Sequence, residues 1–431
     1  MSNKPPRRPI PGLGALWIGK EEEKLLLDVV RRKELFRYYG RNPAKPPPMA
    51  ATLEREFRKM MGTRFALAVN SGTSALEAAM GALGIGPGDE VIVPAWSWIS
   101  CFTSVVRMGA LPVLAEIDET FCLAPGEITR LATPRTRAVM VVHYQGVAAD
   151  MKPILREARK AGIKVIEDCA ESAGAFYHGK RVGSLGDMGI FSFQIQKSMT
   201  CGEGGMIVTN NPKLYERAIR MHDIGQVRAY HTQFIRPRPE SFSGSQFRMT
   251  ELQAAVALAQ LRKLDRVRRR CRSLQDRIMR RIKNLAGLEF RRIPDPKGDS
   301  GFEIYFCLET PEIAAEFRKR LDACNVNCQQ MTSTYCHYAR EYCIQGRAHA
   351  LSASPFKKFR KWPARGYRKE DFPKTEHLIR RFVALPLGVL YTQKDADHIA
   401  DTVCRIHRGL VSPEAAQAGS RHPSRCIKLK T

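Results

Sequence analysis

Residues 191–205 read FSFQIQKSMTCGEGG, a strand-like alternation of side chains that runs into Lys197 and then into a turn with three glycines. A lysine at the mouth of a buried strand is costly unless its amine is paired, neutralised or used in a covalent bond. The natural covalent use is a Schiff base with a carbonyl compound, most commonly pyridoxal phosphate. On this stretch alone, a lysine at a strand end with its amine in solvent remains the simpler interpretation.

From Phe65 onward, short apolar strands alternate with helices. We expect strands over residues 65–69, 90–93, 111–115, 138–142, 163–167, 189–193 and 206–208, and helices over 73–83, 98–107, 151–161 and 250–285. Short strands that are buried on both faces and separated by helices predict an α/β fold with a mostly parallel sheet flanked by helices. In such sheets, ligands bind at the carboxyl ends of the strands.

The 431 residues are enough for more than one domain. We predict an N-terminal arm and helix over residues 1–50, a large domain over 51–290, a smaller α+β domain over 291–412 and a loose tail over 413–431. The boundary near residue 291 rests on the break IPDPKGD at 293–299. The N-terminus lacks the apolar core of a secretory signal, and no apolar run reaches the roughly 18 residues of a membrane span. We therefore expect a cytoplasmic protein with no membrane contact.

Lysine and arginine outnumber aspartate and glutamate by 70 to 43, which gives a formal net charge of +27. Much of the excess lies in residues 262–292, where apolar residues at helical spacing predict a helix with arginines on its solvated faces. No aromatic interleaving or nucleic-acid motif accompanies these arginines, so we expect no nucleic-acid binding but attraction of anionic small molecules. The twelve cysteines are scattered singly and match no compact zinc spacing, which predicts reduced thiols and no metal site.

Two expected strand ends carry residues suited to a flat, phosphorylated ligand. Gly72 and Thr73 stand where the first strand turns into a helix, and the backbone N–H groups and dipole of a helix start favour a phosphate. An ordinary N-cap explains the same residues. Trp98 follows the next strand and has the flat ring needed to stack on a planar cofactor, although core packing explains an aromatic residue there equally well.

Two further strand ends complete the set. Asp168 follows the apolar strand at 163–166, where a carboxylate can keep a pyridine nitrogen protonated, or simply cap a helix. Lys197 follows the strand at 189–193, which also offers the Ser192 hydroxyl to a phosphate. A phosphate turn, an aromatic residue, an aspartate and a lysine in this order on one sheet are far more specific than any member alone.

With these residues, the chain resembles the DegT/StrS family of sugar aminotransferases, which are pyridoxal 5'-phosphate enzymes of fold type I. The resemblance covers roughly residues 12–410. Its motifs lie at 70–76, 86–94, 167–168, 192–205 and 244–255. Within the family, the segments 116–120, 201–205 and 293–300 are most similar to enzymes that make 8-amino-3,8-dideoxy-octulosonate (8-amino-Kdo) for lipopolysaccharide biosynthesis, with the inosose aminotransferases next.

The resemblance implies a role for each of these residues. Lys197 would bind the cofactor covalently and carry a proton during transfer, while Asp168 would pair with the ring nitrogen and Trp98 would stack on the ring. Gly72, Thr73 and Ser192 would hold the phosphate. The resemblance also implies a homodimer, glutamate or glutamine as amino donor and a keto-sugar acceptor, which the basic composition suggests is anionic. A lysine at 197 argues against the sugar dehydratases of the family, which carry histidine there.

Two positions depart from the family pattern. Glu171 replaces a glutamine or histidine near the phenolic oxygen of the cofactor, where a carboxylate repels a phenolate unless it is protonated. Gln246 replaces an asparagine that reaches the phosphate of a neighbouring subunit. These changes support an alternative, a pyridoxal phosphate enzyme that catalyses elimination, decarboxylation or amide formation. A non-catalytic binding protein is a further alternative, which the presence of both Lys197 and Asp168 disfavours.

Overall fold

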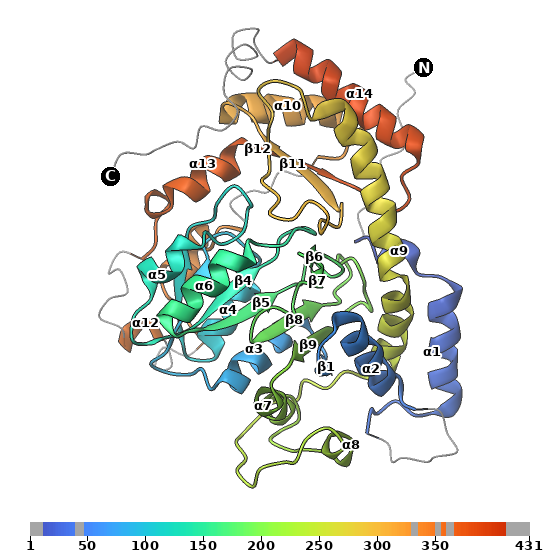
Figure 1. Ribbon diagram of the computed structural model, residues 1–431, viewed down its shortest axis with the longest axis vertical. Coiled ribbons are helices and arrows are strands. Elements are labelled where there is room, and N and C mark those ends of the chain that lie inside the picture. The colour runs from blue at the N-terminus through green and yellow to red at the C-terminus, as the bar shows by residue number, and fades with distance from the viewer. Residues whose placement is uncertain (1–11, 39–46, 329–334, 350–354, 359–365, 411–431) are drawn as a thin grey trace.

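The structure, a computed structural model, describes residues 12–38, 47–328, 335–349, 355–358 and 366–410 (Figure 1). The predicted tail at 413–431 and the first eleven residues of the predicted arm lie outside the described residues. Within the described part, no disulfide joins the cysteines, and no helix is long and apolar enough to cross a membrane.

A seven-stranded sheet forms the centre of the larger part of the molecule. Its strands, in spatial order, are β1 (Phe65–Val69), β9 (Gly205–Thr209), β8 (Met188–Ser192), β5 (Lys164–Asp168), β4 (Thr136–Val142), β2 (Glu90–Pro94) and β3 (Leu111–Ala115). All neighbours are parallel except β9, which runs antiparallel to both β1 and β8. The predicted α/β fold with a mostly parallel sheet is therefore confirmed.

The reversal of β9 follows from the connection that precedes it. Parallel neighbours need a long crossover, usually a helix, whereas antiparallel neighbours can be joined directly. The chain between β8 and β9, residues 193–204, contains no helix and turns back beside β8. Because this connection carries Lys197, the lysine lies in the loop at the carboxyl end of β8 and not within the strand.

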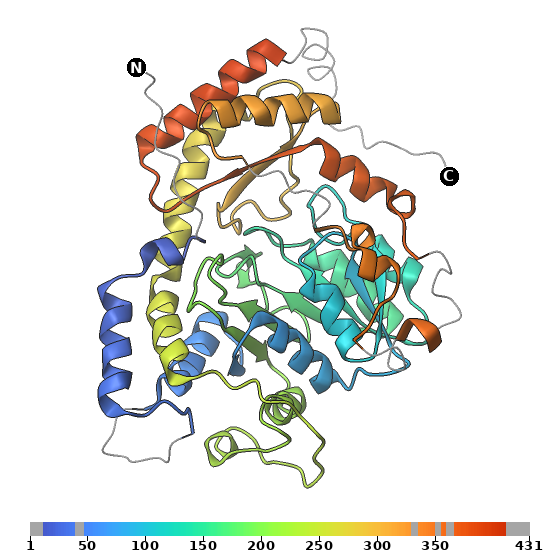
Figure 2. The same ribbon diagram turned by 180° about the vertical axis from the view of Figure 1, so that it is seen from behind.

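Helices cover both faces of the sheet. They are α2 (Met49–Met61), α3 (Gly72–Leu83), α4 (Ser100–Arg107), α5 (Gly126–Leu131), α6 (Met151–Ala161), α7 (Pro212–His222) and the long α9 (Glu251–Ile282). Figures 1 and 2 show α5 and α6 over one face, with α3 and α4 over the other. The strands between them are almost entirely buried. Helix α1 (Lys20–Arg32), predicted over 21–32, packs outside α9.

A second, smaller unit lies at one end of the sheet, at the top of Figure 1. Its antiparallel sheet contains β10 (Glu289–Phe290), β11 (Glu303–Cys307) and β12 (Phe382–Pro386), and its helices are α10 (Pro311–Ala323), α13 (Pro373–Arg381) and α14 (Gln393–Leu410). A separate apolar core joins the three strands, α10 and α14 to the last turns of α9, while the apolar side chains of α13 pack against the core of the larger part. Since α9 contributes to both cores, the predicted boundary at residue 291 remains a proposal.

Some arginines of α9 form ion pairs with neighbouring helices and do not simply face solvent. The predicted apolar stripe of this helix is buried, as expected. However, Arg262 forms an ion pair of 2.6 Å with Glu56 of α2, and Arg277 forms one of 2.6 Å with Asp397 of α14. Part of the basic excess at 262–292 therefore holds helices together, which helical periodicity does not reveal.

Candidate active site

The predicted phosphate-binding residues meet where β1 and β8 end. Gly72 is the first residue of α3, and a Cβ atom placed on it would lie 2.7 Å from Cβ of Ser192. Only glycine permits this approach. Thr73 directs its Oγ1 to Oγ of Ser100 at 2.9 Å. A twelve-residue helix whose N-terminus meets a serine across a glycine has the shape and donor chemistry of a phosphate cradle.

Asp168 ends β5 and is 4% exposed. Its carboxylate accepts the N–H of Ala170 at 2.9 Å and the thiol of Cys101 at 3.3 Å. Burial raises the pKa of Asp168, against these two hydrogen bonds and the charge of Lys197, which lower it. A cationic ring nitrogen beside this carboxylate would offset the cost of burying its charge. The sequence did not point to Cys101, because nothing local distinguishes it from a core cysteine.

The amine of Lys197 is paired in the interior and not left in solvent. Its Nζ lies 3.4 Å from Oε1 of Glu171, and the two side chains are 15% and 9% exposed. The other carboxylate oxygen of Glu171 is buried, with no hydrogen-bond partner in the described part of the chain. Glu171, which replaces the glutamine or histidine usual in the family, thus lies directly beside the predicted Schiff-base lysine.

Within the described residues, no side-chain hydrogen bond or ring contact links Trp98 or Gln246 to Lys197, Glu171 or Asp168. Trp98 is 45% exposed, and its ring centroid lies 5.7 Å from that of Tyr335. Gln246 is exposed, and its backbone pairs with Asp223 at the end of α7. The stacking role of Trp98 and the phosphate role of Gln246 remain predictions, and the latter requires a neighbouring subunit.

The N-terminal segment supports the lysine loop, which sequence reasoning missed. The N–H of Gly12 donates to the carbonyl of Ile195 at 3.2 Å, and the N–H of Gly14 donates to the carbonyl of Lys197 at 3.1 Å. A Cβ on Gly12 would lie 1.9 Å from the backbone of Gln196. The two glycines thus allow one stretch of backbone to lie directly against another.

A second carboxylate from the smaller unit faces the same region. The pKa of Glu303 is raised to about 7, chiefly by burial and also by the charge of Glu171, against a hydrogen bond with Tyr305 and the charge of Arg291, which lower it. The available signal was an acidic residue within the otherwise apolar and aromatic run at 302–306. Sequence reasoning misses this residue, because only the fold brings Glu303 of β11 within reach of the charge of Glu171.

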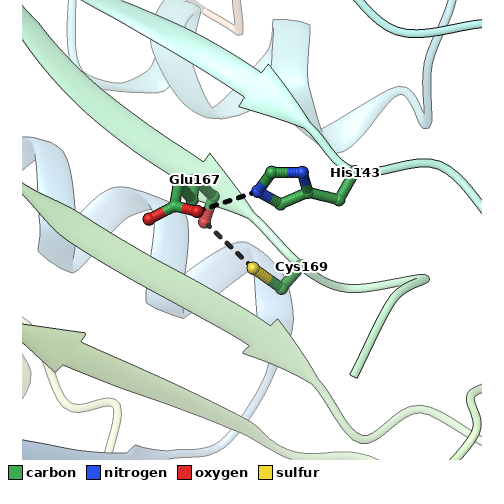
Figure 3. Close-up of side chains that lie close together, drawn as sticks. All are labelled: His143, Glu167 and Cys169. Carbon is green, nitrogen blue, oxygen red and sulfur yellow. Dashed lines mark hydrogen bonds and ion pairs between the residues drawn. The ribbon is translucent and has the colours of Figure 1, made fainter. Parts of the chain in front are cut away.

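His143, Glu167 and Cys169 form a buried group with atoms close enough to hold a metal ion (Figure 3). Nδ1 of His143 accepts the N–H of Ala149 at 3.0 Å, so Nε2 carries the proton and donates to Glu167 at 2.9 Å. Three further N–H groups bind the Glu167 carboxylate at 2.6–2.8 Å, those of Gly183, Leu185 and Gly186. Because the ligand atoms are already used, we interpret the group as a hydrogen-bonded brace for β5.

Residues 44–404 match the profile of the DegT/DnrJ/EryC1/StrS aminotransferase family. The chain belongs to this family. The resemblance seen in the sequence is thereby confirmed at family level. DegT aminotransferases depend on pyridoxal phosphate, so the cofactor predicted from Lys197 and Asp168 is that of the family. The cradle at Gly72 and the buried Asp168 carboxylate fit the phosphate and the ring nitrogen of this group.

One relative is GDP-perosamine synthase of Caulobacter vibrioides, 46% identical over 215 residues. The match covers 49% of this chain and 56% of the relative, so it spans just over half of that protein. It gives no support to the octulosonate specificity that we expected from the DegT resemblance.

Solved structures of this fold cover almost the whole chain. DesV of S. venezuelae is 28% identical with a TM-score of 0.73, covering 90% of this chain and 94% of that one. 3-Amino-5-hydroxybenzoic acid synthase is 27% identical with a TM-score of 0.73, and the match covers 90% of this chain and 96% of that one. An aminotransferase from Psychrobacter cryohalolentis, 24% identical with a TM-score of 0.77, covers 94% and 100% and shows the fold alone. The fold-type-I prediction is confirmed.

Proposed function

We propose that this chain is a pyridoxal phosphate-dependent aminotransferase that moves an amino group from glutamate or glutamine to a keto sugar. The observation that carries the proposal is the placement of Lys197, whose Nζ lies 3.4 Å from Glu171 at the sheet edge where Asp168 ends β5. A lysine beside a carboxylate, with a second buried carboxylate nearby, suits proton transfer next to a cationic ring.

Each residue of the candidate site has its own role toward the cofactor. When bound, pyridoxal phosphate supplies an electron sink that stabilises negative charge on the reacting carbon of the substrate. The α3 N-terminus and Ser192 would hold the phosphate, and Asp168 would keep a positive charge on the ring nitrogen. Lys197 would anchor the group through Nζ and would carry a proton at that atom. Glu171 orients the Lys197 amine.

The acceptor is the finer part of the proposal. The name of the Caulobacter relative favours a nucleotide-linked sugar, and the octulosonate inferred from resemblance is a second candidate. Both are anionic, which suits a chain of net charge +27. We further propose that the enzyme works as a homodimer, with Gln246 reaching the partner's site, and that it is cytoplasmic. Glu171 keeps open the alternative of elimination, decarboxylation or amide formation on the same cofactor.

Absorbance of the cofactor-loaded protein tests the proposal. Addition of L-glutamate or L-glutamine should bleach the visible band of the bound cofactor, and an acceptor keto sugar should restore it. Lys197→Ala should lose the band, while Lys213→Ala, an exposed lysine on α7, should keep it. A band that ignores both donors would favour the alternative chemistry. Failure to bind pyridoxal phosphate at all would overturn both enzyme interpretations.

A further inference from the structure

We propose that Cys101 is a positioning residue for the reaction: its thiol donates to the Asp168 carboxylate and thereby keeps the proton that Asp168 shares with the cofactor on the ring nitrogen. The inference rests on the proposed function, in which Asp168 faces that nitrogen. It adds a buried hydrogen-bond relay behind the carboxylate, formed by His337, Ser97 and Cys101, which determines where the shared proton resides.

The thiol of Cys101 lies against the Asp168 carboxylate in the interior. Its Sγ is 3.3 Å from Oδ2, and both residues are buried. Burial raises the pKa of Cys101 well above its usual value, and the charge of Asp168 raises it further, so the thiol keeps its proton and can donate it. The N–H of Ala170 donates to Oδ1 at 2.9 Å. Each carboxylate oxygen therefore receives one donor and can still accept another.

Ser97 and His337 lie behind the Cys101 thiol. The hydroxyl of Ser97 forms a hydrogen bond with the thiol, and Nε2 of His337 lies 2.9 Å from that hydroxyl. Burial, helped by the charge of Arg340, lowers the pKa of His337 to about 3, so the imidazole is neutral. Its Nδ1 is buried and has no hydrogen-bond partner in the described part of the chain. Because a buried N–H is rarely left unpaired, we place the proton on Nε2, which donates it to Ser97.

All three hydrogen bonds of the relay then have the same direction. His337 donates to Ser97, and Ser97 donates to Cys101. Cys101 in turn donates to the Asp168 carboxylate. Aligned hydrogen bonds polarise one another, and donors to a carboxylate favour its ionised form. The relay therefore stabilises negative charge on Asp168.

This stabilisation matters because the proton between Asp168 and a ring nitrogen can rest on either partner. Burial raises the pKa of Asp168 and so favours a neutral acid beside a neutral ring, and the charge of Glu171 acts in the same direction. The hydrogen bonds from Ala170 and Cys101 and the charge of Lys197 oppose this effect. Among the described residues, Cys101 is the only one whose side chain forms a hydrogen bond with the carboxylate. Its removal should therefore move the proton toward Asp168.

The backbone holds the relay in place. The N–H of Ser97 donates to the carbonyl of Tyr335 at 3.1 Å, and the N–H of His337 donates to the carbonyl of Ala95 at 3.0 Å. The segment that carries His337 thus runs antiparallel to the chain that follows β2. Cys101 lies in the first turn of α4. A short backbone pairing and a helix therefore fix the two ends of the relay.

Nitrogen NMR of the cofactor-loaded protein tests the inference, with pyridoxal phosphate labelled with ¹⁵N in the ring as the probe. The wild type should show the resonance of a protonated ring nitrogen. Cys101→Ala should shift it toward that of an unprotonated ring, whereas Cys101→Ser, which keeps a donor, should not. Ser97→Ala should give a smaller shift in the same direction. The matched control Cys271→Ala, which removes a buried thiol from an apolar cluster on α9, should match the wild type.

Infrared spectra of the cofactor-free protein test the hydrogen bond itself. The difference between wild type and Cys101→Ala isolates the S–H stretching band of Cys101, and the same subtraction with Cys271→Ala isolates that of Cys271. Donation to a charged oxygen weakens an S–H bond, so the Cys101 band should lie at the lower frequency. Asp168→Asn, which offers a neutral acceptor, should move the Cys101 band upward. Equal frequencies for the two thiols would overturn the inference.

The inference is also overturned if the ring nitrogen is unprotonated in the wild type, or if Cys101→Ala leaves its resonance unchanged. Should Cys101→Ala fail to fold, the resonance of Ser97→Ala decides in its place. The absorbance response of the wild type to L-glutamate separates the two levels. If glutamate bleaches the cofactor band but the resonance does not respond to the substitutions, only the role of Cys101 is wrong. If glutamate has no effect, the proposed transaminase is wrong, whatever the resonance shows.

Discussion

Nζ of Lys197 lies 3.4 Å from Oε1 of Glu171, and both side chains are largely shielded from water. From the sequence, the Glu171 carboxylate is expected to repel the phenolate oxygen of the cofactor. The geometry gives the carboxylate a cationic partner instead, at least before the lysine reacts. Glu171 therefore acts first on the lysine, and its effect should be visible in the reaction of the protein with its cofactor.

We predict that Glu171→Gln accelerates the association of pyridoxal phosphate with the cofactor-free protein. The Lys197 amine must leave its ion pair before it can attack the aldehyde, and a partly shielded pair is worth about 1 kcal/mol. Its loss should raise the rate about fivefold at neutral pH. Stopped-flow absorbance measures this rate, with Glu203→Gln in the exposed part of the same loop as control. A rate that is unchanged or lower would show that the ion pair does not restrain the lysine.

We predict that Gly14→Ala displaces Lys197 through the backbone contact between the N-terminal segment and the lysine loop. The N–H of Gly14 binds the carbonyl of Lys197 at 3.1 Å, and an added Cβ would lie 2.8 Å from Cα of Met199. Moving the lysine loop to relieve this contact costs about 1–3 kcal/mol, as overpacking does elsewhere. We expect weaker cofactor binding and a shift in the pH at which the visible band titrates.

Gly126→Ala is the matched control, because a Cβ at that exposed residue at the start of α5 meets nothing within 4 Å. If Gly14→Ala lowers the thermal midpoint yet leaves the titration of the band unchanged, the N-terminal segment stabilises the fold without positioning Lys197.

Glu303 should make the stability of the cofactor-free protein depend on pH. Its folded-state pKa is raised to about 7, chiefly by burial and then by Glu171, against Tyr305 and Arg291. Between pH 4.5 and 7 the folded state holds a proton that the unfolded chain releases. The free energy of unfolding therefore falls as pH rises through this window, by up to about 1.4 kcal/mol per pH unit.

Urea unfolding of the wild type and Glu303→Gln at pH 5, 6, 7 and 8 measures this contribution. The stability of the variant relative to the wild type should increase from pH 5 to pH 8, since an amide never ionises. Glu240→Gln, at an exposed site, should show no such trend. A constant difference across the four pH values would show that Glu303 titrates at the same pH in both states.

Local pattern predicted much of the fold because the buried strands and amphipathic helices are strongly periodic. Residues 111–115 and 151–161 form a strand and a helix at the predicted bounds. Helix α2 was missed behind a proline-rich stretch, and the direction of β9 is not encoded in its side-chain alternation. Direction depends on the connection before the strand, whose path is set by tertiary packing.

In the candidate site, too, some residues could be predicted from the sequence and others could not. Asp168 and Lys197 could be placed beside one another from sequence because the carboxyl ends of parallel strands share one edge. The contact of Cys101 with Asp168 spans 67 residues, and Glu303 comes from the smaller unit altogether. Such contacts leave no local signature, since each residue on its own is an ordinary member of a helix or strand.

Substitution of Glu167 distinguishes a hydrogen-bonded structural role of the His143–Glu167 pair from a role in metal binding. Glu167→Gln replaces one acceptor oxygen with a donor that faces N–H groups, so we expect a loss of about 3–5 kcal/mol in the free energy of unfolding. Added Zn²⁺ or EDTA should leave the thermal midpoint of the wild type unchanged, because Nε2 of His143 and both oxygens of Glu167 already make hydrogen bonds. A midpoint that Zn²⁺ raises in the wild type but not in Glu167→Gln would show that the hydrogen-bonded group opens to bind an ion.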